Sequence, residues 1–232
     1  MVLKDLASSP ALDKGLAVIF KYRYTTAAMI FHSLIHPPKV YEFIQNLFGA
    51  EKIREKLRRH AGPSENQTIL DVGAGTGIYR AAFQSGRYIA LELDPKRVNF
   101  LVEKRHPALA VVANAAALCF KDKSMDIVLC VFLAHHLSET DFPHLLREVS
   151  RVARGKFIFI DPLADSKSWM RKCLWKLDQG HNPRSAETLL SYIQAEFEIE
   201  HQEQFKILHR YLLCVATPKH ENSPSLRPPP TV

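Results

Sequence analysis

Short apolar runs alternate with amphipathic segments through the middle of the chain. The runs that predict β-strands are residues 68–72, 88–93, 109–113, 127–133 and 156–160. The segments between them with helical spacing of apolar residues are 78–85, 96–104 and 141–153. This alternation is typical of an α/β protein, in which parallel strands lie buried between helices. A helix capped by Ser185 follows, and then two β-type runs, 197–208 and 211–216, predict an antiparallel hairpin.

Three helical patterns precede this alternating part. They cover residues 12–35, 38–48 and 50–61. In the last of them, Ile53 and Leu57 predict the buried side, and Gly62-Pro63 predicts the end of the helix. Its basic residues are expected to be mostly exposed; they are Lys52, Arg54, Lys56, Arg58 and Arg59.

A minimal nucleotide-binding sheet has no place for these leading helices, so they require a separate role. We expect residues 1–62 to form a helical cap, residues 63–218 the core and residues 219–232 a disordered tail rich in Pro and Ser. The aromatic residues of the cap, among them Tyr22 and Tyr24, either pack as core or line an apolar substrate pocket.

Composition limits the kinds of protein to which this chain can belong. A chain of 232 residues that is 47% hydrophobic can bury one sizeable core. Its four cysteines lie far apart in sequence, and no His/Cys cluster has the spacing of metal ligands, so we expect reduced thiols and no metal site. The start of the chain shows neither an export signal nor a membrane span, which predicts a cytoplasmic protein.

The net charge of +7 is concentrated near the N-terminus, where residues 1–60 hold ten Lys/Arg and five Asp/Glu. An excess of this kind indicates either an acidic partner such as RNA or a solvated helix face. The second interpretation is the more common one.

A glycine-rich turn, Asp71-Val72-Gly73-Ala74-Gly75-Thr76-Gly77, follows the first predicted strand directly. Glycines permit positive φ angles and let the backbone approach a ligand closely. The dinucleotide fingerprint would place its third glycine where Ile78 stands, so this turn differs from that of a dehydrogenase. The pattern indicates a nucleotide-binding turn of another kind.

The turn resembles the first motif of the class I S-adenosylmethionine (SAM)-dependent methyltransferases. That family has a Rossmann-like, seven-stranded α/β sheet flanked by helices, often with an N-terminal helical lid over the cofactor. The resemblance implies that the loop wraps the amino-acid end of SAM. The residues that it assigns to the cofactor here are Asp71, Gly73, Ala74, Gly75 and Gly77.

Later segments resemble the same family in the same order, over about residues 64–218. Glu92, at the end of the second predicted strand, would accept hydrogen bonds from the ribose hydroxyls. Asn114 stands where the family ordinarily has an acid that receives the adenine amino group, and a neutral amide oxygen is a weaker acceptor. The further cofactor-binding residues implied are Leu93, Ala115, Cys130 and Val131.

Paired histidines follow the fourth predicted strand, as they do in a small-molecule branch of that family. Because the sulfonium already makes the methyl group electrophilic, the protein mainly aligns the acceptor and removes a proton where the acceptor carries one. His135 or His136 would act as the base, with Asp161 orienting the ring or binding substrate; equally, a histidine on such a turn can be structural. Phe132 and Arg184 are candidate substrate contacts.

Three functions stay open. The first is transfer of a methyl group from SAM to an oxygen, nitrogen or carbon atom of a small molecule, by a monomer or homodimer. The second is methylation of RNA through the basic helix, which we consider less favoured. The third is a protein that binds SAM without catalysis. The acceptor is not specified by the sequence, although no motif for methylating exocyclic amino groups of bases follows the fourth strand.

Overall fold

The computed structural model describes residues 49–83, 85–164, 182–207 and 210–219. The expected cap helices before residue 49, with Tyr22 and Tyr24, and the expected tail beyond residue 219 lie outside the described residues. Within the described part, no helix is long and apolar enough to cross a membrane.

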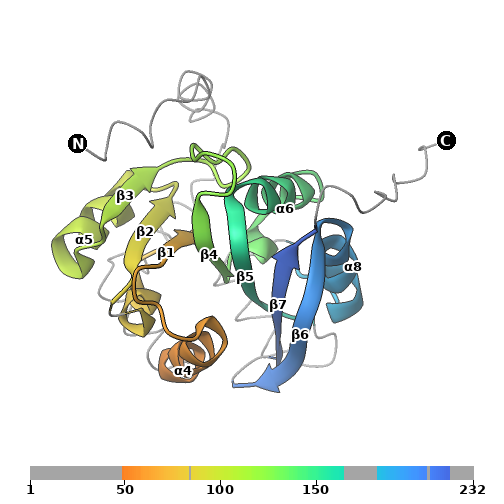
Figure 1. Ribbon diagram of the computed structural model, residues 1–232. Helices are drawn as coiled ribbons and strands as arrows, with labels where there is room; N and C mark the ends of the chain where they lie inside the picture. The colour runs from red at the N-terminus through yellow and green to blue at the C-terminus, as the bar shows by residue number, and fades with distance from the viewer. Residues whose placement is uncertain (1–48, 84, 165–181, 208–209, 220–232) are drawn as a thin grey trace, which may run out of the picture.

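One seven-stranded sheet forms the centre of the molecule, with the strand order β3-β2-β1-β4-β5-β7-β6 (Figure 1). Its strands are β1 (Thr68–Val72), β2 (Arg87–Glu92), β3 (Leu109–Val112), β4 (Met125–Val131), β5 (Ala153–Pro162), β6 (Phe197–Lys206) and β7 (Arg210–Pro218). The first five strands pair in parallel, whereas β7 is antiparallel to both of its neighbours. The predicted parallel sheet and C-terminal hairpin are therefore confirmed.

Within the described residues, one helix precedes the first strand, and the other helical elements lie between strands in sequence. They are α4 (Ala50–Ala61), the short 3-10 helix η2 (Ile78–Ala82), α5 (Pro95–Arg105), the 3-10 turn η3 (Ala134–His136), α6 (Asp141–Val152) and α8 (Ala186–Glu196). Asp94 caps α5 by accepting from the Lys96 amide. Ser185 caps α8 by accepting from the Thr188 amide, as the sequence predicts.

Alternate residues along each strand pack on opposite faces of the sheet. In β1, Leu70 and Val72 join the apolar layer under α6 and α8, which we call the α6 face. Ile69 joins the layer under α4 and η2, which we call the α4 face. Both layers are well buried, which explains why the central strands are apolar at nearly every position.

Two elements differ from the sequence-based expectation. The helix expected over 78–85 is only a 3-10 helix that ends at Ala82, because Phe83, with φ −127° and ψ 70°, leaves the helical conformation. The fifth strand begins at Ala153 and not at Lys156, and it carries an extra residue opposite β4. Gly155 lies in that irregularity, where a Cβ would overlap the Asp126 carbonyl.

Candidate functional site

The site lies where the strand order reverses, between β1 and β4. In open α/β sheets the connections on the two sides of such a point diverge and leave a crevice at the carboxyl ends of the strands. The glycine loop 73–77 follows β1 at this place, and the turn that carries His135 and His136 follows β4. Strand order therefore brings together two motifs about 60 residues apart in sequence.

The glycine loop has the backbone conformation that its sequence predicts. Gly73, Gly75 and Gly77 have φ angles of 74°, 57° and 67°, which L side chains rarely adopt. A Cβ at Gly73 would lie 2.9 Å from the Leu133 side chain, and one at Gly77 would overlap the Leu101 side chain. The loop therefore needs glycine both for its backbone angles and for its close neighbours.

Glu92 fixes this loop to the end of β2. Its Oε2 accepts from the Gly75 amide at 2.8 Å, and its Oε1 accepts from the Leu93 and Asp94 amides at 2.8 and 3.1 Å. The Gly73 and Ala74 amides donate to the Leu91 carbonyl. A buried carboxylate is thus held rigidly beside the loop. Oε1 already accepts two hydrogen bonds, whereas Oε2 accepts one and has a second lone pair available for a ligand.

The Asp71 side chain lies on the α4 face of the sheet and is fully buried. It accepts a hydrogen bond from the hydroxyl of Tyr88, a fully buried residue of β2. Burial raises the pKa of the Asp71 carboxyl to about 7, and the nearby charge of Glu92 adds to the effect, while the Tyr88 hydrogen bond opposes it. Burial, together with the neighbouring Asp71 charge, raises the pKa of Tyr88 above its usual range.

The end of β3 lies next to that of β2, because the Ala113 amide donates to the Glu92 carbonyl at 3.2 Å. Asn114 follows, and its Oδ1 accepts from the Ala116 amide at 2.9 Å. One lone pair of the Asn114 oxygen, the predicted acceptor for the adenine amino group, is therefore used within the chain. The other lone pair is left for a ligand. Ala115 is buried directly after it.

The end of β4 lies beside the end of β1, where Cys130 pairs with Val72. Cys130 and Val131 are buried, so they offer a ligand mainly their backbone. Burial raises the pKa of the Cys130 thiol well above its usual range, and the charges of Asp161 and Asp71 raise it further. This thiol is therefore an inert core group.

Phe132, the next residue, has a φ angle of 58°, a conformation that costs energy for a bulky side chain. Its amide is held by the Ile160 carbonyl at 2.8 Å. Its half-buried ring makes an edge contact with Tyr79 and a tilted contact with Tyr211, at centroid distances of 6.2 and 5.2 Å. The strained backbone turns the chain so that Leu133 covers Gly73.

His135 and Asp161 form a buried pair at the carboxyl ends of β4 and β5. The His135 Nδ1 lies 3.0 Å from the Asp161 Oδ1, and both side chains are only 1% exposed. The same oxygen accepts from the Ala134 amide at 3.2 Å. His136 is exposed, and its ring centroid lies 4.1 Å from that of His135. The structure thus separates the two histidines into one ring held by a carboxylate and one ring open to solvent.

Arg184 forms hydrogen bonds to the backbone of this turn. It is only 5% exposed and donates to the Ala134 and Leu137 carbonyls at 2.8 and 2.9 Å, on either side of the histidines. It also pairs with Glu139 at 2.9 Å and lies over the Phe142 ring. We predicted a substrate contact for Arg184, but its guanidinium is committed to these groups, so its position indicates a structural role.

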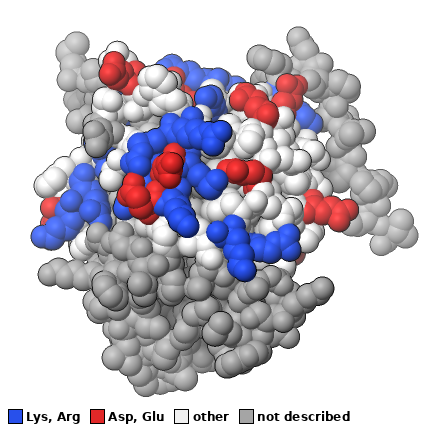
Figure 2. Space-filling model, turned by 90° about the horizontal axis from the view of Figure 1, so that it is seen from below, with Lys and Arg blue, Asp and Glu red and all other residues white. Residues whose placement is uncertain are grey.

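The basic side of α4 is partly neutralised. Arg54 and Arg58 both pair with Glu51 at 2.7 Å, and Lys56 pairs with Glu203 of β6 at 2.6 Å. Figure 2 shows acidic groups set among the basic ones on the face seen from below. Three of the five basic residues of α4 are therefore paired with carboxylates.

The residues around the crevice fit an adenosyl group. Leu93 is 54% exposed beside Glu92, which offers apolar area to an adenine ring next to a carboxylate for ribose hydroxyls. The Thr76 hydroxyl, inside the loop, is buried with no hydrogen-bond partner among the described residues. No sequence pattern marked Tyr88 as a site residue, and Thr76 could have been indicated only by its position inside the glycine motif.

Comparison with known proteins identifies a domain within the chain. Residues 70–160 match the family described as methyltransferase domain (Methyltransf_11). The chain is 31% identical to the thiol S-methyltransferase TMT1A of Homo sapiens over 143 residues, which are 56% of this chain and 58% of that protein. It is 30% identical to the uncharacterized methyltransferase YcgJ of Bacillus subtilis over 139 residues, or 56% and 54% of the two chains. The matched part thus spans little more than half of these relatives.

Solved structures show the same fold. The 1,6-didemethyltoxoflavin-N1-methyltransferase of Burkholderia thailandensis, bound to S-adenosylhomocysteine, superposes with a TM-score of 0.63 at 17% identity, over 86% of this chain and 93% of that one. The geranyl diphosphate C-methyltransferase of Streptomyces coelicolor has a TM-score of 0.61 at 14% identity, over 73% and 80%. Fold, motif order and family match agree. Residues 70–160 therefore carry a methyltransferase domain, in a fold that the chain shares with these two solved methyltransferases.

Proposed function

We propose that this protein transfers the methyl group of SAM to a small-molecule acceptor that carries a dissociable proton, with a thiol as the first candidate. The observation that carries the proposal is the buried hydrogen bond between His135 and Asp161, at the carboxyl ends of two central strands and beside the glycine loop. A histidine oriented by a carboxylate is a common arrangement for a general base.

SAM, when bound, supplies an activated methyl group. The residues proposed to hold it are those that surround the crevice on the β1 side. The glycine loop lets backbone amides approach the amino-acid end, while Glu92 accepts from the ribose and Leu93 contacts the adenine. Asn114 retains one lone pair for the adenine amino group. Asp71 contributes a carboxyl group at the end of β1, whose charge depends on pH near neutrality.

On the β4 side, the residues of the chain handle the acceptor. Asp161, when ionised, only accepts hydrogen bonds, so Nδ1 of His135 carries the proton between them. Nε2 is then the basic nitrogen of the neutral ring. As the acceptor atom takes the methyl group, its proton passes to Nε2, and the carboxylate stabilises the imidazolium that forms. Arg184 holds the carbonyls around this turn, which keeps the ring in place.

The thiol is favoured because the human relative is named a thiol S-methyltransferase and matches over this part of the chain. The two structural neighbours act, by their names, on a nitrogen and on a carbon atom, so the fold admits several acceptors. A base matters for a thiol or phenol, and it is not needed for an acceptor without a proton to lose. A loss of kcat when His135 is replaced would therefore indicate an acceptor that must lose a proton.

The test is an acceptor screen with radiolabelled SAM, in which alkyl and aryl thiols are compared with phenols, amines and alcohols. With the best acceptor, His135→Ala and Asp161→Asn should reduce kcat by about 10²- to 10⁴-fold, the range of general base catalysis. Calorimetric titration should show that affinity for S-adenosylhomocysteine is retained within about twofold.

His144→Ala, an exposed histidine of α6, is the matched control and should leave kcat unchanged. His136→Ala separates the two rings, because it removes the exposed one and leaves the buried pair intact. Unchanged kcat in His135→Ala would refute the role of the buried pair. Tight S-adenosylhomocysteine binding with no turnover on any acceptor class would instead favour a SAM-binding protein without catalysis.

A further inference from the structure

A β-bulge in β6 changes which residues face α4. Ile199 pairs with Ala216 of β7, but His201 pairs with Val215, so Glu200 is the extra residue. Before the bulge, Phe197 and Ile199 pack on the α6 face. Side chains alternate along a strand, so the extra residue transfers the following odd-numbered positions to the α4 face.

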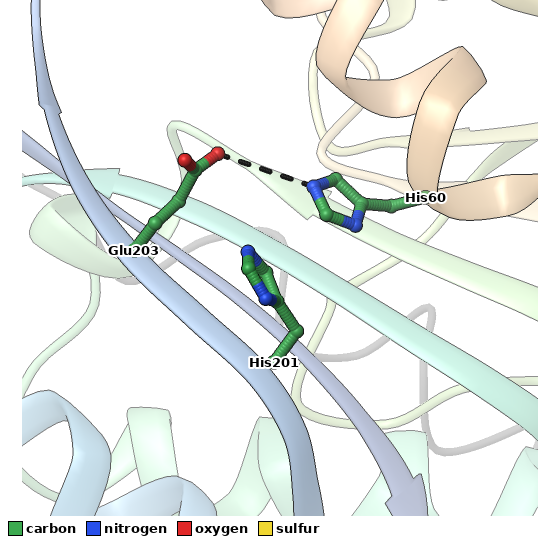
Figure 3. A group of neighbouring side chains, drawn as sticks. All are labelled: His60, His201 and Glu203. Atoms are coloured by element: carbon green, nitrogen blue, oxygen red, sulfur yellow. Dashed lines mark ion pairs between the residues drawn. The ribbon is translucent and has the colours of Figure 1, made fainter.

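The bulge thereby places His201 and Glu203 opposite the end of α4, where His60 lies (Figure 3). The three side chains come from two elements that are about 140 residues apart in sequence. The ring centroids of His60 and His201 lie 4.7 Å apart, nearly parallel, and Nε2 of His60 lies 3.9 Å from Oε1 of Glu203. One ligand atom from each residue can be chosen so that all three lie within 4.8 Å of one another.

Two imidazoles and one carboxylate are a ligand set that suits Zn²⁺, which prefers nitrogen and carboxylate oxygen in tetrahedral geometry. With bonds of about 2.1 Å, two ligand atoms of a tetrahedral ion lie about 3.4 Å apart. The His60 and Glu203 atoms are within about half an ångström of that separation. His201 is exposed, so its ring can rotate to complete the set.

We infer that His60, His201 and Glu203 form a binding site for a divalent transition-metal ion, with Zn²⁺ as the best fit. The fourth position faces solvent and takes water. The ion ties the end of α4 to the edge of the sheet, because its ligands come from both elements. This site lies away from the glycine loop and does not depend on the proposed methyl transfer.

Lys56 is part of the same cluster. Its ammonium group bonds to Oε1 of Glu203 at 2.6 Å, and the same nitrogen lies 4.5 Å from the centroid of the Phe205 ring. This cation competes with a metal ion for the carboxylate. Lys56→Met keeps an unbranched apolar side chain at this position and removes the competing charge, so it should tighten Zn²⁺ binding several-fold. A cluster that is merely a surface salt bridge would not gain metal affinity from this change.

The experiment is calorimetric titration of the full chain, first treated with a chelator, with ZnCl₂. The native protein should bind one equivalent that is weakened at least tenfold, or lost, in His201→Ala and in Glu203→Gln. His144→Ala is the matched control, since it removes an exposed histidine outside the cluster and should keep that equivalent. Co²⁺ in place of Zn²⁺ should give the intense visible absorption of a tetrahedral site in the native protein and in His144→Ala, and not in His201→Ala or Glu203→Gln.

Thermal unfolding provides the second measurement. At a Zn²⁺ concentration about a hundredfold above Kd, the unfolding midpoint of the native protein should rise by about 5–10 °C. The midpoint of His201→Ala should not move, while circular dichroism without metal confirms that this variant is folded. Two results would overturn the site: absence of Zn²⁺ binding by the native protein, and equal binding by the native protein, His201→Ala and Glu203→Gln.

Discussion

Replacing Asp71 by Asn should change how the stability of the protein depends on pH. Asp71 is fully buried and accepts from Tyr88, and its pKa is raised from an ordinary 3.8 to about 7. An Asn side chain keeps an acceptor for the Tyr88 hydroxyl and has nearly the same shape, but it does not titrate. The substitution therefore removes the ionisation and preserves the contact.

The sign follows from which state holds the proton. Between pH 3.8 and about 7 the folded protein keeps a proton on Asp71 that the unfolded chain has lost. The free energy of unfolding therefore falls as pH rises through this window, and the contribution of Asp71 is complete only below pH 3.8. Each pH unit corresponds to about 1.4 kcal/mol, so the total loss is about 4 kcal/mol, of which about 3 kcal/mol falls between pH 5 and 8.

The assay is urea unfolding of the native protein and Asp71→Asn, without cofactor, at intervals from pH 5 to pH 8. The difference between the two proteins isolates Asp71, because carboxyls with lowered pKa, such as Glu148 and Asp126, respond identically in both. Asp71→Asn should gain about 3 kcal/mol over the native protein across this range. Glu65→Gln, at an exposed acidic residue, is the control and should follow the native curve. A difference that stays constant with pH would show that Asp71 is ionised throughout and would refute the reasoning.

Three further predictions concern the loop and the histidine turn. Gly77→Ala should destabilise the fold by about 2–4 kcal/mol in urea unfolding, because alanine is strained at the positive φ angle of this position and its Cβ would overlap the Leu101 side chain. Glu92→Gln should weaken S-adenosylhomocysteine binding at least tenfold by calorimetry, since an amide cannot accept from all three backbone amides that the carboxylate holds. Arg184→Met should cost about 3 kcal/mol of stability and lower kcat with little change in cofactor affinity, because two carbonyls of the histidine turn lose their donor.

Parts of the site follow directly from local sequence. The glycine motif required positive φ angles at three positions, and the structure has them. Asp94 and Ser185 carry the cap signatures that the helices use. The interpretation that Asp161 orients a histidine ring depended on the family resemblance. The structure adds that His135, and not His136, lies 3.0 Å from its carboxylate.

Other features had no local signal. Arg184 looks like a solvent-facing loop residue in sequence, yet it lies buried under a turn formed almost 50 residues earlier, where it satisfies two carbonyls. The helix expected at 78–85 shortens to a 3-10 turn because the chain leaves the helical conformation at Phe83. Helical periodicity over so few residues does not determine where a helix ends.

The sequence by itself determined which segments become strands and helices, because side-chain periodicity and capping act over a few residues. It also determined the glycine loop, whose backbone angles only glycine adopts easily. Tertiary structure alone decided which distant side chains meet: Asp71 with Tyr88, Arg184 with the histidine turn, and His60 with His201 and Glu203. The physical reason is that strand order and a single bulge set which face and which neighbour each side chain has, and neither is encoded in local periodicity.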